Sequence, residues 1–250
     1  MVEKYLNNRF LILYILPFFF GSLTTLSFQP FNLTIINFII FPSIFYLLVF
    51  INKKSRFVYR EKPYKKNFFI FGLFFGIGFY LSGISWITNS LTFDENFKVL
   101  IPFSLLLLPL FLGLFTAIPI FIIGPYLRFD LPSLILFAGI LSISDFIRSK
   151  VLTGFPWNLW AYSTSWNNEI LQVLNLIGLY AYNLLVISAF LLPTIIFFKT
   201  SSLKKFLYFC FSILSIFSLY IYGNFEINKN NKYLKEINNK VFIKIVSPNF

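Results

Sequence analysis

Histidine is absent from all 250 residues, and the chain has only one cysteine and nine acidic side chains. Without histidine it cannot form Ser–His or Cys–His nucleophile pairs or histidine-ligated metal sites. Cys210 cannot form an intramolecular disulfide, and its place between Phe209 and Phe211 in an apolar run predicts a small buried residue without chemistry. No carboxylates have the spacing of an acid–base couple, since the adjacent Asp94 and Glu95 are typical of a solvated loop.

Charged residues are also scarce, at 12% against 58% hydrophobic residues, and the mean hydropathy is +0.77. A soluble domain is about a quarter charged. The apolar residues form runs long enough to cross a hydrocarbon core of about 30 Å, which takes about 17–25 helical residues. We therefore expect an all-α polytopic membrane protein with about seven transmembrane helices, at Phe10–Leu26, Leu33–Ile51, Phe68–Asn89, Val99–Ile123, Leu131–Ile147, Ile170–Phe198 and Phe206–Gly223. The sixth segment is long, which predicts a tilted helix or an initial interfacial turn.

The basic residues predict how these segments are oriented. If the N-terminus is cytoplasmic, the cytoplasmic segments 1–9, 52–67, 124–130 and 199–205 contain thirteen Lys and Arg residues. The short outer loops then contain only Lys98, Arg148 and Lys150. This asymmetry follows the positive-inside rule and puts everything after Gly223 outside. The net charge of +12 is therefore attributed to topology and contact with anionic lipid, and not to nucleic-acid binding.

Two regions combine polar and aromatic residues near the expected outer surface. One is the Gly83–Trp86 segment (GISW) at the end of the third span. The same span contains earlier glycines, at 72, 76 and 78, which are expected to serve helix packing. The other begins with Asp145 and Arg148, which can pair on one helix face, and continues through Trp157 and Trp160. The charged pair is interpretable as a structural clamp or as a functional group. The loop after it is interpretable as an aromatic belt or as a re-entrant platform for a lipid.

The last residues have a different pattern from the spans. Residues 1–223 form the expected helical domain, and the Asn- and Lys-rich stretch 224–240 is expected to be a linker. Residues 241–250 begin with a strand-like run, VFIKIV. A lone strand cannot satisfy its backbone hydrogen bonds. We therefore expect this run to be the first β-strand of a second domain that is otherwise missing from the chain.

Several motifs resemble those of one family. Thr153–Trp157 (TGFPW), preceded by Asp145 and Arg148, is similar to the hallmark loop of apolipoprotein N-acyltransferases. Gly83–Trp86, the Phe28–Pro30 turn (FQP) and the tail 241–250 also resemble that family, the tail resembling the first strand of its nitrilase-like α/β domain. The chain departs from the family pattern in having Asp145 where Glu is usual and Ser247 where Gln is usual. The family's catalytic Glu, Lys and Cys, and its last membrane span, have no counterpart in this sequence.

The resemblance implies that a complete protein transfers an acyl chain from a phospholipid to its Cys, and then to the diacylglyceryl-cysteine amine of an apolipoprotein. It also implies a bacterial inner-membrane location with a periplasmic tail, and no metal or cofactor. Candidates for a lipid entrance are Trp86, Asp145, Arg148, Trp157 and Trp160. This chain alone is expected to be inactive. Two alternatives stay open, a transporter or channel, which calls for paired discontinuous helices and buried charges, and a non-catalytic membrane scaffold.

Overall fold

The computed structural model describes residues 8–58, 64–151, 154 and 156–236. Every regular element in this part of the chain is helical. A π-helical turn at Leu11–Ile15 leads into the first α-helix, and short 3₁₀ segments join the others. The α-helices are α2 (Leu16–Thr24), α3 (Asn37–Val58), α4 (Tyr64–Ile84), α5 (Ile101–Ile123), α6 (Leu131–Arg148), α7 (Asn168–Leu171), α8 (Leu174–Phe190) and α9 (Ser202–Glu236).

Five of the described helical segments are long and apolar enough to cross a membrane, and they are Thr34–Lys53, Lys65–Thr92, Glu95–Tyr126, Leu131–Arg148 and Ser202–Glu236. The apolar helices Leu11–Ser27 and Leu174–Phe190 are shorter. Each of the seven expected segments thus overlaps an apolar helix, but two of them fall short of the expected span length. Several apolar helices in a chain of this composition make it a multi-pass membrane protein.

The expected fold class, seven spans followed by a β-strand, is wrong. The described residues contain helices and no strand, and the run at 241–250 lies outside them. The sixth expected span is interrupted because Gly178 has a φ of 74°, which a continuous helix cannot accommodate, and because a separate 3₁₀ turn begins at Leu192 with Pro193 as its second residue. The described part of the expected linker 224–240 is helical, since α9 continues to Glu236.

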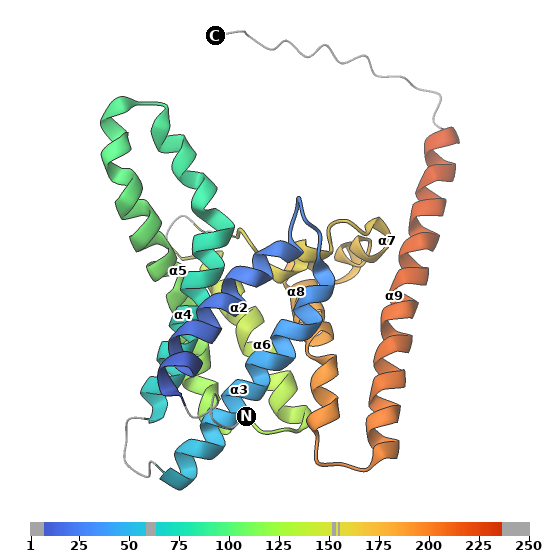
Figure 1. Ribbon diagram of the computed structural model, residues 1–250. Coiled ribbons are helices and arrows are strands. Elements are labelled where there is room, and N and C mark those ends of the chain that lie inside the picture. The colour runs from blue at the N-terminus through green and yellow to red at the C-terminus, as the bar shows by residue number, and fades with distance from the viewer. Residues whose placement is uncertain (1–7, 59–63, 152–153, 155, 237–250) are drawn as a thin grey trace.

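The connections between helices lie at two opposite ends of the molecule (Figure 1). The turn between α5 and α6 and the turn between α8 and α9 lie at the lower end of the view, together with the end of α3. The tip of the α4–α5 hairpin and α7 lie toward the upper end. The expected cytoplasmic and outer connections are therefore separated in space, as alternating spans require.

Helix α9 stands at one side of the bundle (Figure 1) and buries only Gly223 among its own residues 202–236. At this point the helix passes close to the carbonyl of Glu169 in α7. With 35 residues, α9 is about 50 Å long at 1.5 Å per residue, which exceeds the hydrocarbon thickness. Cys210 is exposed on this helix, so the expectation that it is buried is wrong.

Glycines let helices α2, α4 and α5 approach closely, as the third span's glycine pattern predicts. A Cβ built on Gly78 would lie 2.1 Å from the Phe18 carbonyl of α2, and one built on Gly21 would lie 2.1 Å from the Phe75 carbonyl of α4. Gly72 meets Ala117 of α5 in the same way. Small residues at such crossings let backbones come into van der Waals contact, which drives helix association in lipid.

This packing makes Gly78→Ala destabilising, because the added methyl group overlaps backbone that cannot rotate away. We expect a loss of about 1–3 kcal/mol, the usual cost of overpacking. Gly139→Ala is the matched control, since a Cβ on Gly139 of α6 has no atom within 4 Å. Thermal unfolding of the two variants in detergent tests this, and equal melting temperatures would contradict the packing described.

Candidate functional site

Helix α6 brings two charged side chains to the same buried spot. Asp130 begins the helix by accepting a hydrogen bond from the Ser133 amide at 2.9 Å, and Asp145 and Arg148 occupy its last turn. The Arg148 Nη2 atom lies 3.0 Å from Asp145 Oδ1. The two residues are only 1% and 7% exposed respectively, so the pair is hidden from solvent. The expected pairing one turn apart is therefore present.

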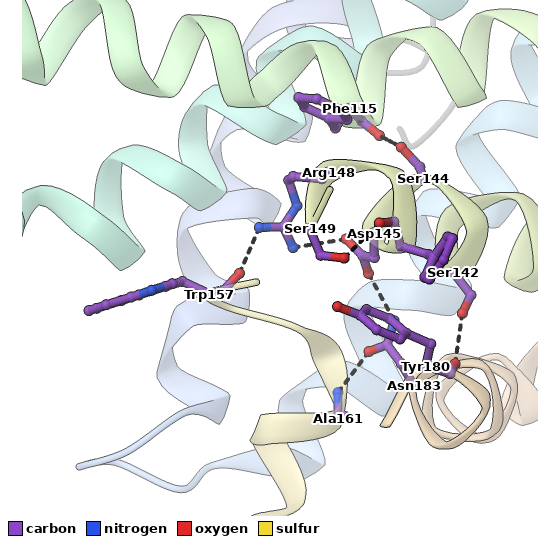
Figure 2. Close-up of polar contacts among 11 residues, drawn as sticks. Phe115, Ser142, Ser144, Asp145, Arg148, Ser149, Trp157, Ala161, Tyr180 and Asn183 are labelled. Atoms are coloured by element: carbon purple, nitrogen blue, oxygen red, sulfur yellow. Dashed lines mark hydrogen bonds and ion pairs between the residues drawn. The ribbon is translucent and has the colours of Figure 1, made fainter. Parts of the chain in front are cut away.

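Asn183 of α8 completes the environment of the carboxylate (Figure 2). Its Nδ2 donates to Asp145 Oδ2 at 2.9 Å, and its Oδ1 accepts from the Ala161 amide, also at 2.9 Å. Both Asp145 oxygens thus accept a hydrogen bond, as a buried carboxylate requires. Asn183 on α8 is thus bonded both to Asp145 on α6 and to the backbone of the segment after Trp157, so it joins these three parts of the chain.

Arg148 also holds the aromatic loop. Its Nη1 donates to the Trp157 carbonyl at 2.7 Å (Figure 2). Its guanidinium lies over the Tyr80 ring of α4, 5.3 Å from the ring centre. The loop's backbone fits this arrangement, because Gly154 and Asn158 have positive φ angles of 80° and 52°. Glycine and asparagine are the residues that adopt this left-handed conformation most readily.

The loop presents Trp157 at the surface, stacked on Trp86. The ring centres are 4.8 Å apart with the planes inclined by 30°, and the two residues are 44% and 51% exposed. The approach is close because Gly83 lies against the Asn158 side chain, where a Cβ would come within 2.2 Å of the amide nitrogen. The two motifs singled out in the sequence therefore meet in one structure, which we call the Trp86–Trp157 platform.

A shallow pocket of about 290 Å³ adjoins the platform. It is lined by Pro156, Trp157, Asn158 and Tyr162. Burial raises the pKa of Tyr162, a shift that Tyr180 increases and Arg148 opposes. The hydroxyl is therefore neutral at physiological pH and can donate a hydrogen bond. An aromatic wall with amide and hydroxyl groups suits an amphipathic molecule with an apolar body and a polar head.

Trp160 lies apart from the other four candidate residues. It is only 3% exposed, and its ring stacks on Phe79 at 4.4 Å and meets Phe41 edge-on at 4.9 Å. Phe28 and Phe75 lie beside it. The structure thus brings together Trp86, Asp145, Arg148 and Trp157, and puts Trp160 in the aromatic core beneath them.

Sequence reasoning missed Asn183, Tyr80 and Asn158. Asn183 carried a usable signal, since a carboxamide in the apolar run of α8 needs a buried partner. Tyr80 carried no such signal, because a tyrosine in the aromatic-rich α4 does not stand out from its neighbours. The left-handed position of Asn158 becomes recognisable only with the backbone in view.

Substitutions of Asp145 and Arg148 should have strongly non-additive effects on the free energy of unfolding. Asp145→Asn and Arg148→Gln each leave one charge without its partner in a buried site, which costs about 3–5 kcal/mol. The double variant should cost clearly less than the sum, by about 1–3 kcal/mol. The free energy of unfolding in detergent is measured for the two single variants and the double variant. Glu95 and Lys98 form the control cycle, because they pair at the same spacing but are exposed, where coupling is below about 1 kcal/mol. Equal coupling in the two cycles would contradict a buried, interdependent pair.

Comparisons with known proteins agree with the motifs at this site. The family model described as "Apolipoprotein N-acyltransferase N-terminal domain" matches residues 20–192, which run from within α2 to just past the end of α8 and include every residue of the site. The "Apolipoprotein N-acyltransferase" of Bradyrhizobium diazoefficiens is 32% identical over 181 residues, 72% of this chain and 33% of the relative. That of Rhodopseudomonas palustris is 30% identical over 177 residues, 70% of this chain and 32% of the relative.

A protein of the same name from Rickettsia bellii is 33% identical over 117 residues, 46% of this chain and 23% of that relative. The chain matches about a third of the length of the first two of these curated relatives. More than half of the chain fits the family model. The chain therefore belongs to the apolipoprotein N-acyltransferase family, of which it carries the N-terminal membrane domain.

Proposed function

We propose that this chain is the membrane portion of an enzyme that transfers a phospholipid acyl chain to the N-terminal diacylglyceryl-cysteine of lipoproteins. The observation that carries the proposal is the Trp86–Trp157 platform, held over a buried ion pair at one end of a bundle of apolar helices. Indole rings are favoured at the boundary between hydrocarbon and water. A lipid substrate has its ester groups at this depth.

In the proposed reaction both substrates are anchored in the membrane. A cysteine thiolate attacks the acyl ester carbonyl of the phospholipid, which forms a thioester and releases the lysophospholipid. The α-amine of the diacylglyceryl-cysteine then attacks the thioester, which forms an amide, regenerates the thiol and leaves a proton to a base. Two steps through a good nucleophile and leaving group are easier than one direct transfer. The family resemblance assigns the Cys, Lys and Glu to an outer nitrilase-like domain.

The residues of this chain would act by positioning the lipid. Trp86 and Trp157 offer a flat apolar face, while Asn158 and Tyr162 offer polar groups beside it. Arg148 fixes the Trp157 backbone, and Asp145 with Asn183 fixes Arg148. Trp160 supports this arrangement from the core. The proposed orientation has the N-terminus in the cytoplasm and the platform at the periplasmic face of the inner membrane.

Helices α3 to α6 would keep the outer domain at the leaflet that holds both substrates. A path for ions or solutes needs charges that face a cavity and can exchange partners. The Asp145 carboxylate instead has both oxygens bonded inside the protein. At this end of the bundle the pair therefore favours a clamp that shapes the lipid site over the charged path that the transporter alternative needs.

Truncating the platform should weaken use of the lipid donor in the complete enzyme. Trp157→Ala or Trp86→Ala removes half of the flat apolar face on which the lipid is proposed to rest, so kcat/KM for the phospholipid should fall roughly three- to tenfold, which corresponds to about 0.7–1.4 kcal/mol of lost binding. Acyl transfer to a diacylglyceryl peptide in mixed micelles measures this. Trp166→Ala is the matched control, because Trp166 is equally exposed but bonds Thr34 away from the platform. Unchanged transfer in both platform variants would refute a lipid-positioning role.

The purified 250-residue chain should not acylate a diacylglyceryl peptide, because the residues to which the family resemblance assigns the chemistry are not in its sequence. Incubation with phosphatidylethanolamine and the peptide, followed by mass spectrometry of the peptide, tests this. A mass increase equal to one acyl chain would overturn the proposal that this chain positions the lipid while an outer domain carries the catalytic residues. Adding a nitrilase-like domain from a relative should restore transfer only if the two parts associate.

A further inference from the structure

A second hollow lies at the other end of the molecule, away from the platform. Its volume is about 530 Å³, within the range of small-ligand sites. Three segments distant in sequence form it: the end of α3, the connection from α5 to α6, and the residues just before α9. These segments lie together at the lower end of the view in Figure 1.

The hollow is lined by one cation from each of these segments. Lys53 comes from α3, Arg128 precedes α6, and Lys199 precedes α9. Asp130 is the acidic residue of the lining, and its carboxylate caps α6 by accepting from the Ser133 amide. Within the part of the chain that the structure describes, none of the three cations forms an ion pair. Asp130 offsets only one of the three positive charges that line this pocket, so the remaining repulsion among the cations would be relieved by an anion.

The walls of this hollow are firmly built. Asn52, which is 4% exposed, donates from Nδ2 to the Leu127 carbonyl at 2.9 Å and so fixes α3 to the α5–α6 connection. Below it, the rings of Tyr46, Phe129 and Phe197 form a triangle with centres 5.1–5.7 Å apart. Lys53 Nζ lies 4.6 Å from the centre of the Phe129 ring. The three cation-bearing segments are therefore held in place by packing and do not depend on an anion to assemble.

From this we infer that the hollow lined by Lys53, Arg128 and Lys199 is a binding site for a phosphate group. Lysine binds phosphate as a point charge, and arginine binds it through two parallel N–H donors. The site adds to the acyl-transfer proposal and does not rest on it, because no residue of the platform takes part.

The surroundings favour an anionic phospholipid as the source of the phosphate. A smaller hollow of about 260 Å³ shares Arg128 and Asp130 with the first and continues to Tyr126 and Leu136. Tyr126 and Leu136 are exposed, and Leu136 belongs to the apolar helix α6. A headgroup between the cations could therefore leave its acyl chains along the outer face of α6. Basic pockets of this kind bind anionic lipid headgroups in other membrane proteins.

Native mass spectrometry of the chain in detergent micelles, titrated with phosphatidylglycerol, tests the site. Wild-type protein should retain one phosphatidylglycerol more tightly than phosphatidylcholine. Arg128→Gln and Lys199→Gln should each weaken it roughly three- to tenfold, and the double variant more than tenfold. Lys204→Gln is the matched control, because it removes one exposed charge at the same end of the molecule outside the hollow. Melting temperatures and elution volumes equal to those of the wild type would show that the variants are folded.

A parallel titration with inorganic phosphate separates the two sources. If millimolar phosphate does not displace phosphatidylglycerol, and the double variant no longer retains it, the site is supported with lipid as its occupant. Stabilisation by inorganic phosphate alone, lost in the same variant, supports it with free phosphate. Binding that falls equally in Lys204→Gln and Arg128→Gln would reflect net charge only and would overturn the proposal, as would no binding of either probe.

Discussion

The requirement that buried polar groups find partners inside the protein governs how this chain is arranged. The hydrocarbon core offers no water, so an unpaired Asp or Arg there costs several kcal/mol. Asp145 and Arg148 satisfy most of this requirement through each other, Asn183 and the Trp157 carbonyl. These partners belong to α6, α8 and the aromatic loop. The hydrogen bonds that satisfy the two buried charges therefore also hold these three parts of the chain together at this end of the bundle.

Apolar packing supplies the framework in which that network forms. In lipid the hydrophobic effect does not drive one helix onto another, so close contact and van der Waals attraction take its place. The glycine contacts of α2 with α4, and of α4 with α5, bring these helices together at backbone distance. Trp160 then fills the space between α3 and α4 through its rings' contacts with Phe41 and Phe79. The buried Asp145–Arg148 pair and the Trp86–Trp157 platform rest on this packed core, and the core keeps the pair and the platform at a fixed distance from each other.

Features encoded in short stretches of sequence could be predicted, and long-range ones could not. Apolar runs located the apolar helices of the described residues, although five of these and not seven are long enough to cross a membrane, and the spacing of Asp145 and Arg148 predicted their pairing. The break at Gly178 was missed because an apolar run does not record a positive φ angle. Trp157 and Trp160 look alike in sequence, yet one faces outward and the other enters the core. Their difference depends on Arg148 and Asn183, which hold the backbone on either side of the turn, and no local pattern encodes such contacts.

Helix α6 connects the two polar regions of the molecule. It has 18 residues, so its length of about 27 Å is close to the thickness of the hydrocarbon core. Asp130 at its start adjoins the cationic hollow, and Arg148 at its end holds the platform loop. The start of the helix therefore adjoins three cations without ion pairs among the described residues, while its end carries a charged pair that is internally bonded. The two ends of one helix of about membrane thickness therefore treat charge in opposite ways, and this difference separates the cationic hollow from the platform along the length of α6.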